Sequence, residues 1–319
     1  SNYSVVDDIS ISFYSTFEHE TQGAGNAVYT FDDQIAFMPE INISYIKKSH
    51  FAKNYIYLTH NICSIHMVFR KKAFNHYDTF FCVGPHHNAE IEETEKIYKL
   101  KKIVKFNFGY NKIDQLIINK NKLIKTKKNH DKTLLIAPSW GENCILEKIG
   151  EQLLSILVNK HWKIIIRPHP DTLRLYKKKY NKLKEKFVHH PDCKFEENIS
   201  NMSSYYLSDL MISDWSGTAF EFALGLEKPV IFIDMPKKIN NSDFHLYQTE
   251  PIEIKLREKI GEIVKVEELE ILINVLNKVY ENKKIYKQKI IKAREKIIYN
   301  LGKSASKGAN YIYSLTRTN

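Results

Sequence analysis

Short apolar runs alternate with stretches of helical spacing along most of this chain. In the second half, the runs at 133–137, 162–166, 193–195, 209–213 and 229–233 have the length and composition of strands. The stretches of helical spacing in this half lie at 144–159, 173–187, 199–206 and 220–226. Strands that alternate with helices indicate an α/β domain built on a parallel sheet.

The first half of the chain shows the same alternation. Its predicted strands lie at 54–58, 79–83 and 104–108, and its predicted helices lie at 62–76, 91–100 and 113–124. Closer to the N-terminus, 9–14 and 41–46 are further strand candidates. A second α/β domain is therefore expected.

The stretch at 125–132 contains no apolar residue and predicts a linker. It separates an N-terminal domain over 1–124 from a C-terminal domain over 133–319, which ends in charged helical sequence over 266–299. A chain of 319 residues suits two domains of about 120–170 residues each. The chain opens on Ser1, without an initiator methionine, and leaves open whether residues precede it.

The formal net charge of +11 comes mostly from runs of lysine. Two explanations stay open: solvated surfaces, or a partner that carries many phosphates, such as an anionic membrane face, a polyanionic acceptor or a nucleic acid. The basic helical stretches at 173–186 and 283–296 are the candidates for a membrane contact. No nucleic-acid-binding module is recognised, so a nucleic acid partner is not expected.

The four cysteines are widely spaced and form no CxxC pair, which predicts free thiols of a reducing cytoplasm. No apolar run approaches the roughly 18–20 residues of a membrane-spanning helix. We therefore expect a cytoplasmic protein, soluble or peripheral at the inner face of the membrane.

Polar residues follow the predicted strands at the end where parallel α/β sheets bind ligands. The most informative turn is 214–218, between the strand at 209–213 and the helix at 220–226. Small hydroxyl residues and a glycine at a helix N-terminus present free backbone N–H groups, which bind phosphate well. The alternative is an ordinary helix cap, in which Ser216 or Thr218 satisfies the first turn and nothing binds.

The candidate site residues share this position at strand ends or in the helical turn that follows. They are His60, Ser139, Arg167, His169, Ser213, Asp214, Ser216, Gly217, Thr218 and Glu221. Two α/β domains whose strand ends face each other across a central cleft describe the GT-B architecture, with two Rossmann-like domains. We therefore predict a GT-B-like α/β fold.

Each residue also has a structural alternative. His60 can be a structural histidine, and Arg167 can pair with a carboxylate such as Asp171. His86 and His87 are read as surface residues and not as a metal pair. The sequence has no Asp-x-Asp metal motif, no Walker A loop and no GxGxxG, so we expect no metal or other cofactor.

Several of these motifs together resemble the CDP-glycerol glycerophosphotransferase family, which includes teichoic-acid primases and polymerases and relatives in capsule synthesis. The strongest are Arg-Pro-His-Pro at 167–170 and LMISDWSGTAFEFALGLEKPVIFID at 210–234. Strand-Thr-His at 57–60, Gly-Tyr-Asn-Lys-Ile-Asp at 109–114 and Ala-Pro-Ser-Trp at 137–140 support them. The resemblance covers roughly 52–264. Asn61 departs from it, since the family has glycine there, and the part before residue 50 is short for a complete N-terminal GT-B domain.

The resemblance implies a donor, CDP-glycerol or another CDP-alditol, in the C-terminal domain. The N-terminal domain would serve a polyol-phosphate, polysaccharide or lipid-linked acceptor, whose hydroxyl takes up the alditol phosphate while CMP leaves. His60 and His169 would be the catalytic residues, with His60 as the base. His169 and Arg167 would hold the pyrophosphate together with Ser216, Gly217 and Thr218. Glu221 would reach a ribose or glycerol hydroxyl, and Asp214 would line the site or orient its turn. Ser139 and Ser213 complete the donor-binding set.

Two rival functions remain open at this point. A GT-B glycosyltransferase that uses a nucleotide sugar would share the fold and the phosphate-binding turn. A nucleic-acid-binding protein would exploit the charge of +11 and the 19 tyrosines, and would bind with a steep salt dependence.

Overall fold

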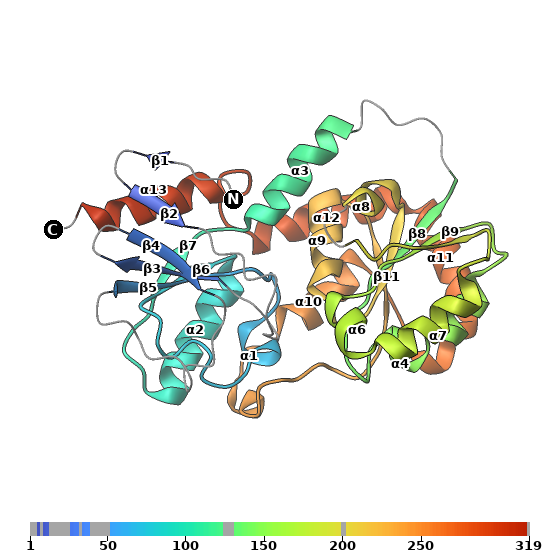
Figure 1. Cartoon of the computed structure of the whole chain (residues 1–319), viewed down its shortest axis with the longest axis horizontal. Helices are drawn as coiled ribbons and strands as arrows, with labels where there is room; N and C mark the ends of the chain where they lie inside the picture. The colour runs from blue at the N-terminus through green and yellow to red at the C-terminus, as the bar shows by residue number, and fades with distance from the viewer. Residues whose placement is uncertain are drawn as a thin grey trace. The chain divides into compact units, whose positions relative to one another are not determined.

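The structure is a computed structural model, and it describes residues 5–6, 9–12, 26–31, 34–38, 52–123, 131–198 and 202–317 (Figure 1). The chain divides into two compact units. The first unit spans 1–111, 239–252 and 296–319, and the second spans 112–238 and 253–295. These units differ from the predicted domains, because 112–123 belongs to the second unit and the C-terminal end of the chain returns to the first.

The second unit is built on a six-stranded sheet in which every neighbouring pair is parallel. Its strands are β8 (Thr133–Ile136), β9 (Lys163–Ile166), β10 (Cys193–Phe195), β11 (Leu210–Ser213), β12 (Val230–Ile233) and β13 (Gly261–Val264). The spatial order is β10-β9-β8-β11-β12-β13. Strands β8, β9 and β10 therefore follow one another toward one edge of the sheet, and β11, β12 and β13 follow one another toward the other edge. The crevice between their carboxyl ends is the switch point where such sheets bind ligands.

Helices precede, connect and follow the strands of this sheet along the chain. They are α3 (Asn111–Leu123), α4 (Ile145–Lys148), α5 (Gly150–Leu157), α6 (Pro170–Leu175), α7 (Lys177–Phe187), α8 (Ser203–Leu207), α9 (Gly217–Leu226), α10 (Ile252–Ile260), η3 (Val266–Ile271), α11 (Leu272–Glu281) and α12 (Lys283–Ile297). Strands β8, β11 and β12 are buried along their whole length, as expected for a parallel sheet covered on both faces.

The first unit has a seven-stranded mixed sheet in the order β1-β2-β4-β3-β5-β6-β7. Its strands are β1 (Val5–Val6), β2 (Ile9–Ser12), β3 (Asn26–Phe31), β4 (Gln34–Met38), β5 (Ala52–Leu58), β6 (Thr79–Cys82) and β7 (Val104–Asn107). Strands β5, β6 and β7 are parallel, whereas β3 pairs antiparallel with both β4 and β5. The helical segments of this unit are α1 (Ile65–Val68), α2 (Pro85–Tyr98), η2 (Phe244–Leu246) and α13 (Ser304–Thr316).

The C-terminal helix α13 completes the core of the first unit, which explains why the chain returns to it. Successive residues of a strand point to opposite faces of the sheet. Phe80 packs in an aromatic cluster with Tyr57 and Phe74, whereas Phe81 packs with Phe108 and Tyr311 of α13. Figure 1 shows the red ribbon of α13 beside the strands of this unit.

The structure corrects several expectations about helices. The helix predicted over 62–76 is only α1, because the backbone is extended at Phe69 and left-handed at Lys72, where φ is 63°. Phe69 and Phe74 both pack into the aromatic cluster. Their helix-like spacing therefore comes from a non-helical segment that brings both rings to the same core. Helix α2 begins at Pro85, a residue whose fixed φ suits the first helical turn. The predicted helices 144–159 and 173–187 are each broken into two.

The structure also bears on the predictions for the two adjacent histidines, the linker and the cysteines. His86 and His87 lie on α2, and His87 is fully buried, so the interpretation of both as surface residues was wrong. The strand predicted at 41–46 and the linker as far as residue 130 lie outside the described residues. The four cysteines are free thiols, as predicted.

Candidate functional site

The carboxyl ends of β8, β9 and β11 lie side by side in the second unit and carry most of the predicted site residues. Ser139 follows β8, Arg167 and His169 follow β9, and the turn at 214–218 follows β11. We call this set of strand ends, together with the first turn of α9, the rim. Because β8 and β11 are adjacent, the rim includes the switch point of the sheet.

Asp214 fastens the β8 loop to the β11 turn. Its buried carboxylate accepts hydrogen bonds from the backbone N–H of Ser139 at 2.7 Å and from that of Ile145 at 3.1 Å. Burial raises the pKa of Asp214, and these hydrogen bonds oppose the shift. The buried hydroxyl of Ser213 donates to the carbonyl of Ala137 at 2.7 Å. Both side chains are engaged within the protein, so their geometry suits positioning of the rim better than contact with a phosphate.

The first turn of α9 is open to an anion. Ser216 stands at the N-cap with extended backbone angles, and in the described part of the chain its hydroxyl makes no capping bond to this helix. Gly217 and Thr218 are partly exposed, whereas the helix is buried from Ala219 onward. The simple capping alternative therefore does not describe Ser216. The helix presents N–H groups and the positive end of its dipole at the rim.

His169 lies at the N-cap of α6, where its Nδ1 accepts a hydrogen bond from the backbone N–H of Asp171 at 3.1 Å. Burial lowers the pKa of His169 to about 4; Asp171 opposes this shift and Lys238 adds to it. The ring is therefore neutral near pH 7, and because Nδ1 accepts a bond, the proton sits on Nε2. His169 is thus suited to donate a hydrogen bond and not to take a proton.

A direct measurement checks this state of His169. We expect the side-chain nitrogen resonances of His169 to show the Nε2–H tautomer at pH 8 and to remain unchanged down to about pH 5. The His169→Gln variant assigns the signals. A titration near pH 6.5 would contradict the neutral ring.

Arg167 is buried and already paired inside the protein. Its guanidinium donates to Glu196 at 3.1 Å and lies 5.3 Å from the ring centroid of Tyr205. The predicted alternative partner, Asp171, instead binds Arg174 at 2.8 Å. The idea of a carboxylate partner was therefore right, but its identity was wrong. A phosphate would share Arg167 with Glu196.

Glu221 lies one turn into α9 and is buried. Lys112 of α3 places its Nζ 2.6 Å from the Glu221 carboxylate. Burial lowers the pKa of Lys112, but the charge of Glu221 and that of Tyr205 more than offset it, so the pKa is raised. This ion pair fixes the carboxylate, and a ligand hydroxyl would meet an already oriented acceptor.

His60 belongs to the first unit, at the carboxyl end of β5. Its Nδ1 lies 3.3 Å from the Tyr57 hydroxyl, and its carbonyl accepts a hydrogen bond of 2.6 Å from the Tyr110 hydroxyl. Tyr110 follows Gly109, whose φ of 98° and close approach to the Tyr299 carbonyl leave no room for a side chain. The Gly-Tyr motif therefore positions the backbone of His60.

The sequence also matches a family model. Residues 52–314 match the model of the family described as CDP-Glycerol:Poly(glycerophosphate) glycerophosphotransferase. The chain belongs to this glycerophosphotransferase family. The protein is accordingly a transferase of the CDP-glycerol glycerophosphotransferase type.

Solved structures show the same fold as this glycerophosphotransferase. The wall teichoic acid polymerase TagF matches with a TM-score of 0.54 and 16% identity, over 85% of this chain and 69% of that one. UDP-GlcNAc 2-epimerase from Neisseria meningitidis matches with a TM-score of 0.50 and 16% identity, over 75% of this chain and 62% of its own. No curated protein sequence matches. These likenesses confirm the α/β, GT-B-like fold class.

Two cations close to the glycerophosphotransferase rim were missed in the sequence. Lys238, beyond β12, donates to the Trp140 carbonyl at 3.1 Å. Arg257 of α10 lies 4.2 Å from the ring centroid of Trp215 and pairs with Asp234 at 2.9 Å. Lys238 could have been found by treating the end of β12 as a fourth strand end. Arg257 lies mid-helix, and no sequence signal marks it.

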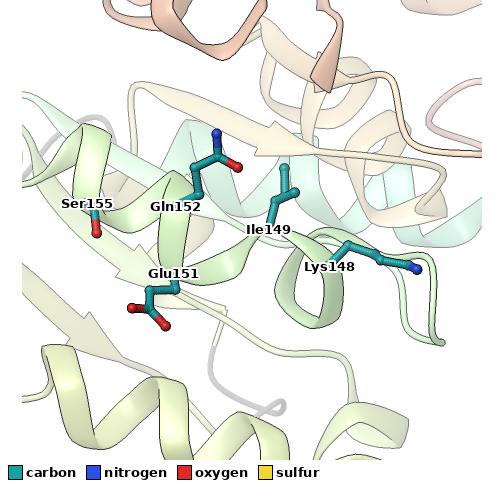
Figure 2. A pocket seen from close by; sticks show the side chains of 5 residues that line it. All are labelled: Lys148, Ile149, Glu151, Gln152 and Ser155. Atoms are coloured by element: carbon teal, nitrogen blue, oxygen red, sulfur yellow. The ribbon is translucent and has the colours of Figure 1, made fainter. Parts of the chain in front are cut away.

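A shallow hollow of 380 Å³ lies on α4 and α5, away from these residues (Figure 2). It is lined by Lys148, Ile149, Glu151, Gln152 and Ser155. Glu151 is paired with Lys186 at 2.7 Å. None of the lining residues belongs to the rim, so this hollow plays no part in the proposed chemistry.

Across 52–123, 131–198 and 202–317 and the described strands before them, no group of three or more His, Cys, Asp or Glu side chains is arranged to hold a metal ion. In the same part of the chain, none of the helices combines the length and the apolar character that crossing a bilayer requires.

Proposed function

We propose that this protein transfers glycerol phosphate, or a related alditol phosphate, from a CDP-activated donor to an acceptor hydroxyl and releases CMP. The acceptor is a polyol-phosphate, polysaccharide or lipid-linked chain, as in teichoic-acid or capsule synthesis. Membership of the family supports the donor and reaction class. The observation that carries the proposal in this chain is the rim, where an uncapped helix start and a neutral histidine follow strands β11 and β9 at the carboxyl edge of one sheet.

The rim suits the pyrophosphate of the donor. The N–H groups at the start of α9 and the Nε2–H of His169 are hydrogen-bond donors that need no proton transfer to bind an anion. The Thr218 hydroxyl already bonds the Tyr205 side chain, so the backbone N–H groups of this turn are the donors assigned to the phosphate. Fixed donors of this kind stabilise charge that develops on phosphate oxygens during transfer. Ser139, Ser213 and Asp214 hold these groups in place.

The reaction balances without a redox step. The acceptor oxygen forms a bond to the β-phosphorus of the donor, and the bond from that phosphorus to the oxygen bridging to the α-phosphate breaks. CMP leaves with the bonding electron pair. The proton of the acceptor hydroxyl goes to His60, which we assign as general base. Glu221 is assigned to a ribose or glycerol hydroxyl.

Phosphorus NMR on a donor panel tests this function. The protein is incubated with a glycerol phosphate oligomer and, in turn, CDP-glycerol, CDP-ribitol, UDP-glucose or UDP-GlcNAc. We expect CMP and a new phosphodiester only with a CDP-alditol and only when the acceptor is present. Release of UDP and formation of a glycoside would instead establish the nucleotide-sugar glycosyltransferase alternative.

We further place the reaction in the cytoplasm, at the inner face of the membrane. Helix α7 buries Tyr180, Leu183 and Phe187 and carries its lysines on its other positions. Those lysines suit an anionic bilayer, although a solvated helix face accounts for them equally well. Sedimentation with anionic vesicles at low and high salt decides between the two, because only a membrane contact gives salt-sensitive binding.

A further inference from the structure

The side chain of Lys238, in the segment that leaves β12, contacts the loop that follows β8. Strand β11 lies between β8 and β12 in the sheet. Lys238, beyond β12, nevertheless reaches Trp140, beyond β8, and donates to its carbonyl at 3.1 Å. The Lys238 side chain therefore links the loops that follow β12 and β8, the two strands that flank β11, and its ammonium lies within electrostatic reach of Asp214 in the turn after β11. This position follows from strand order and one hydrogen bond.

The Lys238 ammonium is built into the rim by two contacts with one residue. Besides its bond to the Trp140 carbonyl, Nζ lies 3.7 Å from the centroid of the Trp140 ring. A lysine ammonium carries three donors, so these contacts leave capacity for a further acceptor. The Trp140 ring also lies 6.0 Å from that of His169. Lysine, tryptophan and histidine thus form one cluster from three different strand ends.

Electrostatics agree with this placement. Burial lowers the pKa of Lys238, while the charges of Asp214 and Asp171 oppose the shift. The same ammonium contributes to the lowered pKa of His169. Lys238 therefore lies within electrostatic reach of the groups on which the proposed donor site depends. A cation that is partly removed from water interacts more strongly with an arriving anion than an exposed lysine does.

We propose that Lys238 is a donor-binding residue that contacts the β-phosphate of the CDP-alditol, the group that is transferred. This inference rests on the proposed function and adds a residue to it. The ammonium neutralises charge on the phosphate that His169 and the start of α9 contact with neutral donors. Trp140 holds the Lys238 stem and ammonium in place.

Calorimetric titration with CDP and CMP tests the role of Lys238, because only CDP carries a β-phosphate. A hydrogen bond to a charged group contributes enough for Lys238→Ala to weaken CDP binding about tenfold to a hundredfold. CMP binding is expected to change less than about threefold, since its single phosphate lies at the α-position. The matched control is Lys237→Ala, an exposed neighbour, which is expected to bind both nucleotides like the wild type.

Further outcomes separate this role from a purely structural one. Lys238→Met keeps the aliphatic stem against Trp140, so it guards against loss of folding in the alanine variant. If Lys238 only clamps Trp140, the variants change the affinities for CDP and CMP equally, and the proposal is overturned. If the wild type binds neither CMP, CDP nor CDP-glycerol, the proposed function itself fails. Wild-type binding of CDP-glycerol with an unchanged CDP-to-CMP ratio in the variants refutes Lys238 alone.

Discussion

His60→Ala is expected to slow the transfer of glycerol phosphate by at least a hundredfold. A positioned general base contributes about 10²–10⁴ in rate, so kcat should fall by that factor. The affinity for CDP-glycerol should stay the same, since the donor groups of the rim belong to other residues. Initial rates of CMP release and a calorimetric titration measure the two quantities separately.

The fold should tolerate this change at His60. The side chain is only partly buried, and its ring contacts include the Tyr57 hydroxyl and an edge contact to Phe69 at 5.9 Å. The bond from Tyr110 goes to the backbone carbonyl and survives the substitution. His189→Ala, at an exposed position, is the control and should retain full activity. Wild-type turnover in His60→Ala would remove His60 from the mechanism.

Asp214→Ala is expected to have the largest effect on stability among the rim residues. The substitution leaves the buried N–H groups of Ser139 and Ile145 without their acceptor. Each unsatisfied donor costs about 1–3 kcal/mol, so the free energy of unfolding should fall by about 2–6 kcal/mol. Because the β8 loop is released from the β11 turn, affinity for CDP should fall as well. Chemical denaturation and titration with CDP measure both effects.

Two further variants sharpen the Asp214 prediction. Asp214→Asn keeps one acceptor oxygen but turns an NH₂ group toward the other N–H, so an intermediate loss is expected. Glu142→Ala removes an exposed carboxylate from the same loop and should change stability by less than about 0.5 kcal/mol. An Asp214→Ala protein as stable as the wild type would show that the loop does not depend on this carboxylate.

The sequence was sufficient for the parts of the fold that depend on local pattern. Parallel strands such as β8, β11 and β12 are buried on both faces, so each appears as an uninterrupted apolar run. The failures have a tertiary cause. Phe69 and Phe74 have helical spacing but serve a cluster around Tyr57, and α13 joins the first unit through contacts of Tyr311 that no local pattern records.

In the candidate site, too, local sequence pattern predicted some features, whereas tertiary contacts determine the others. The positions of His169 and of the turn before α9 followed from strand ends and small residues. Their partners did not, because Glu196 beside Arg167 and Lys112 beside Glu221 are distant in sequence. Lys238 was overlooked because the end of β12 was not counted among the strand ends, and its contacts with the carbonyl and ring of the distant Trp140 leave no local pattern.

The central claim is that the carboxyl edge of the second unit's sheet binds the pyrophosphate of a CDP-alditol. A crystal structure of the complex with CDP-glycerol tests it most directly. We predict that the β-phosphate lies within hydrogen-bonding distance of His169 Nε2, the backbone N–H groups that open α9, and Lys238 Nζ. A nucleotide bound away from the ends of β8, β9 and β11, with this edge occupied only by solvent, would contradict the account.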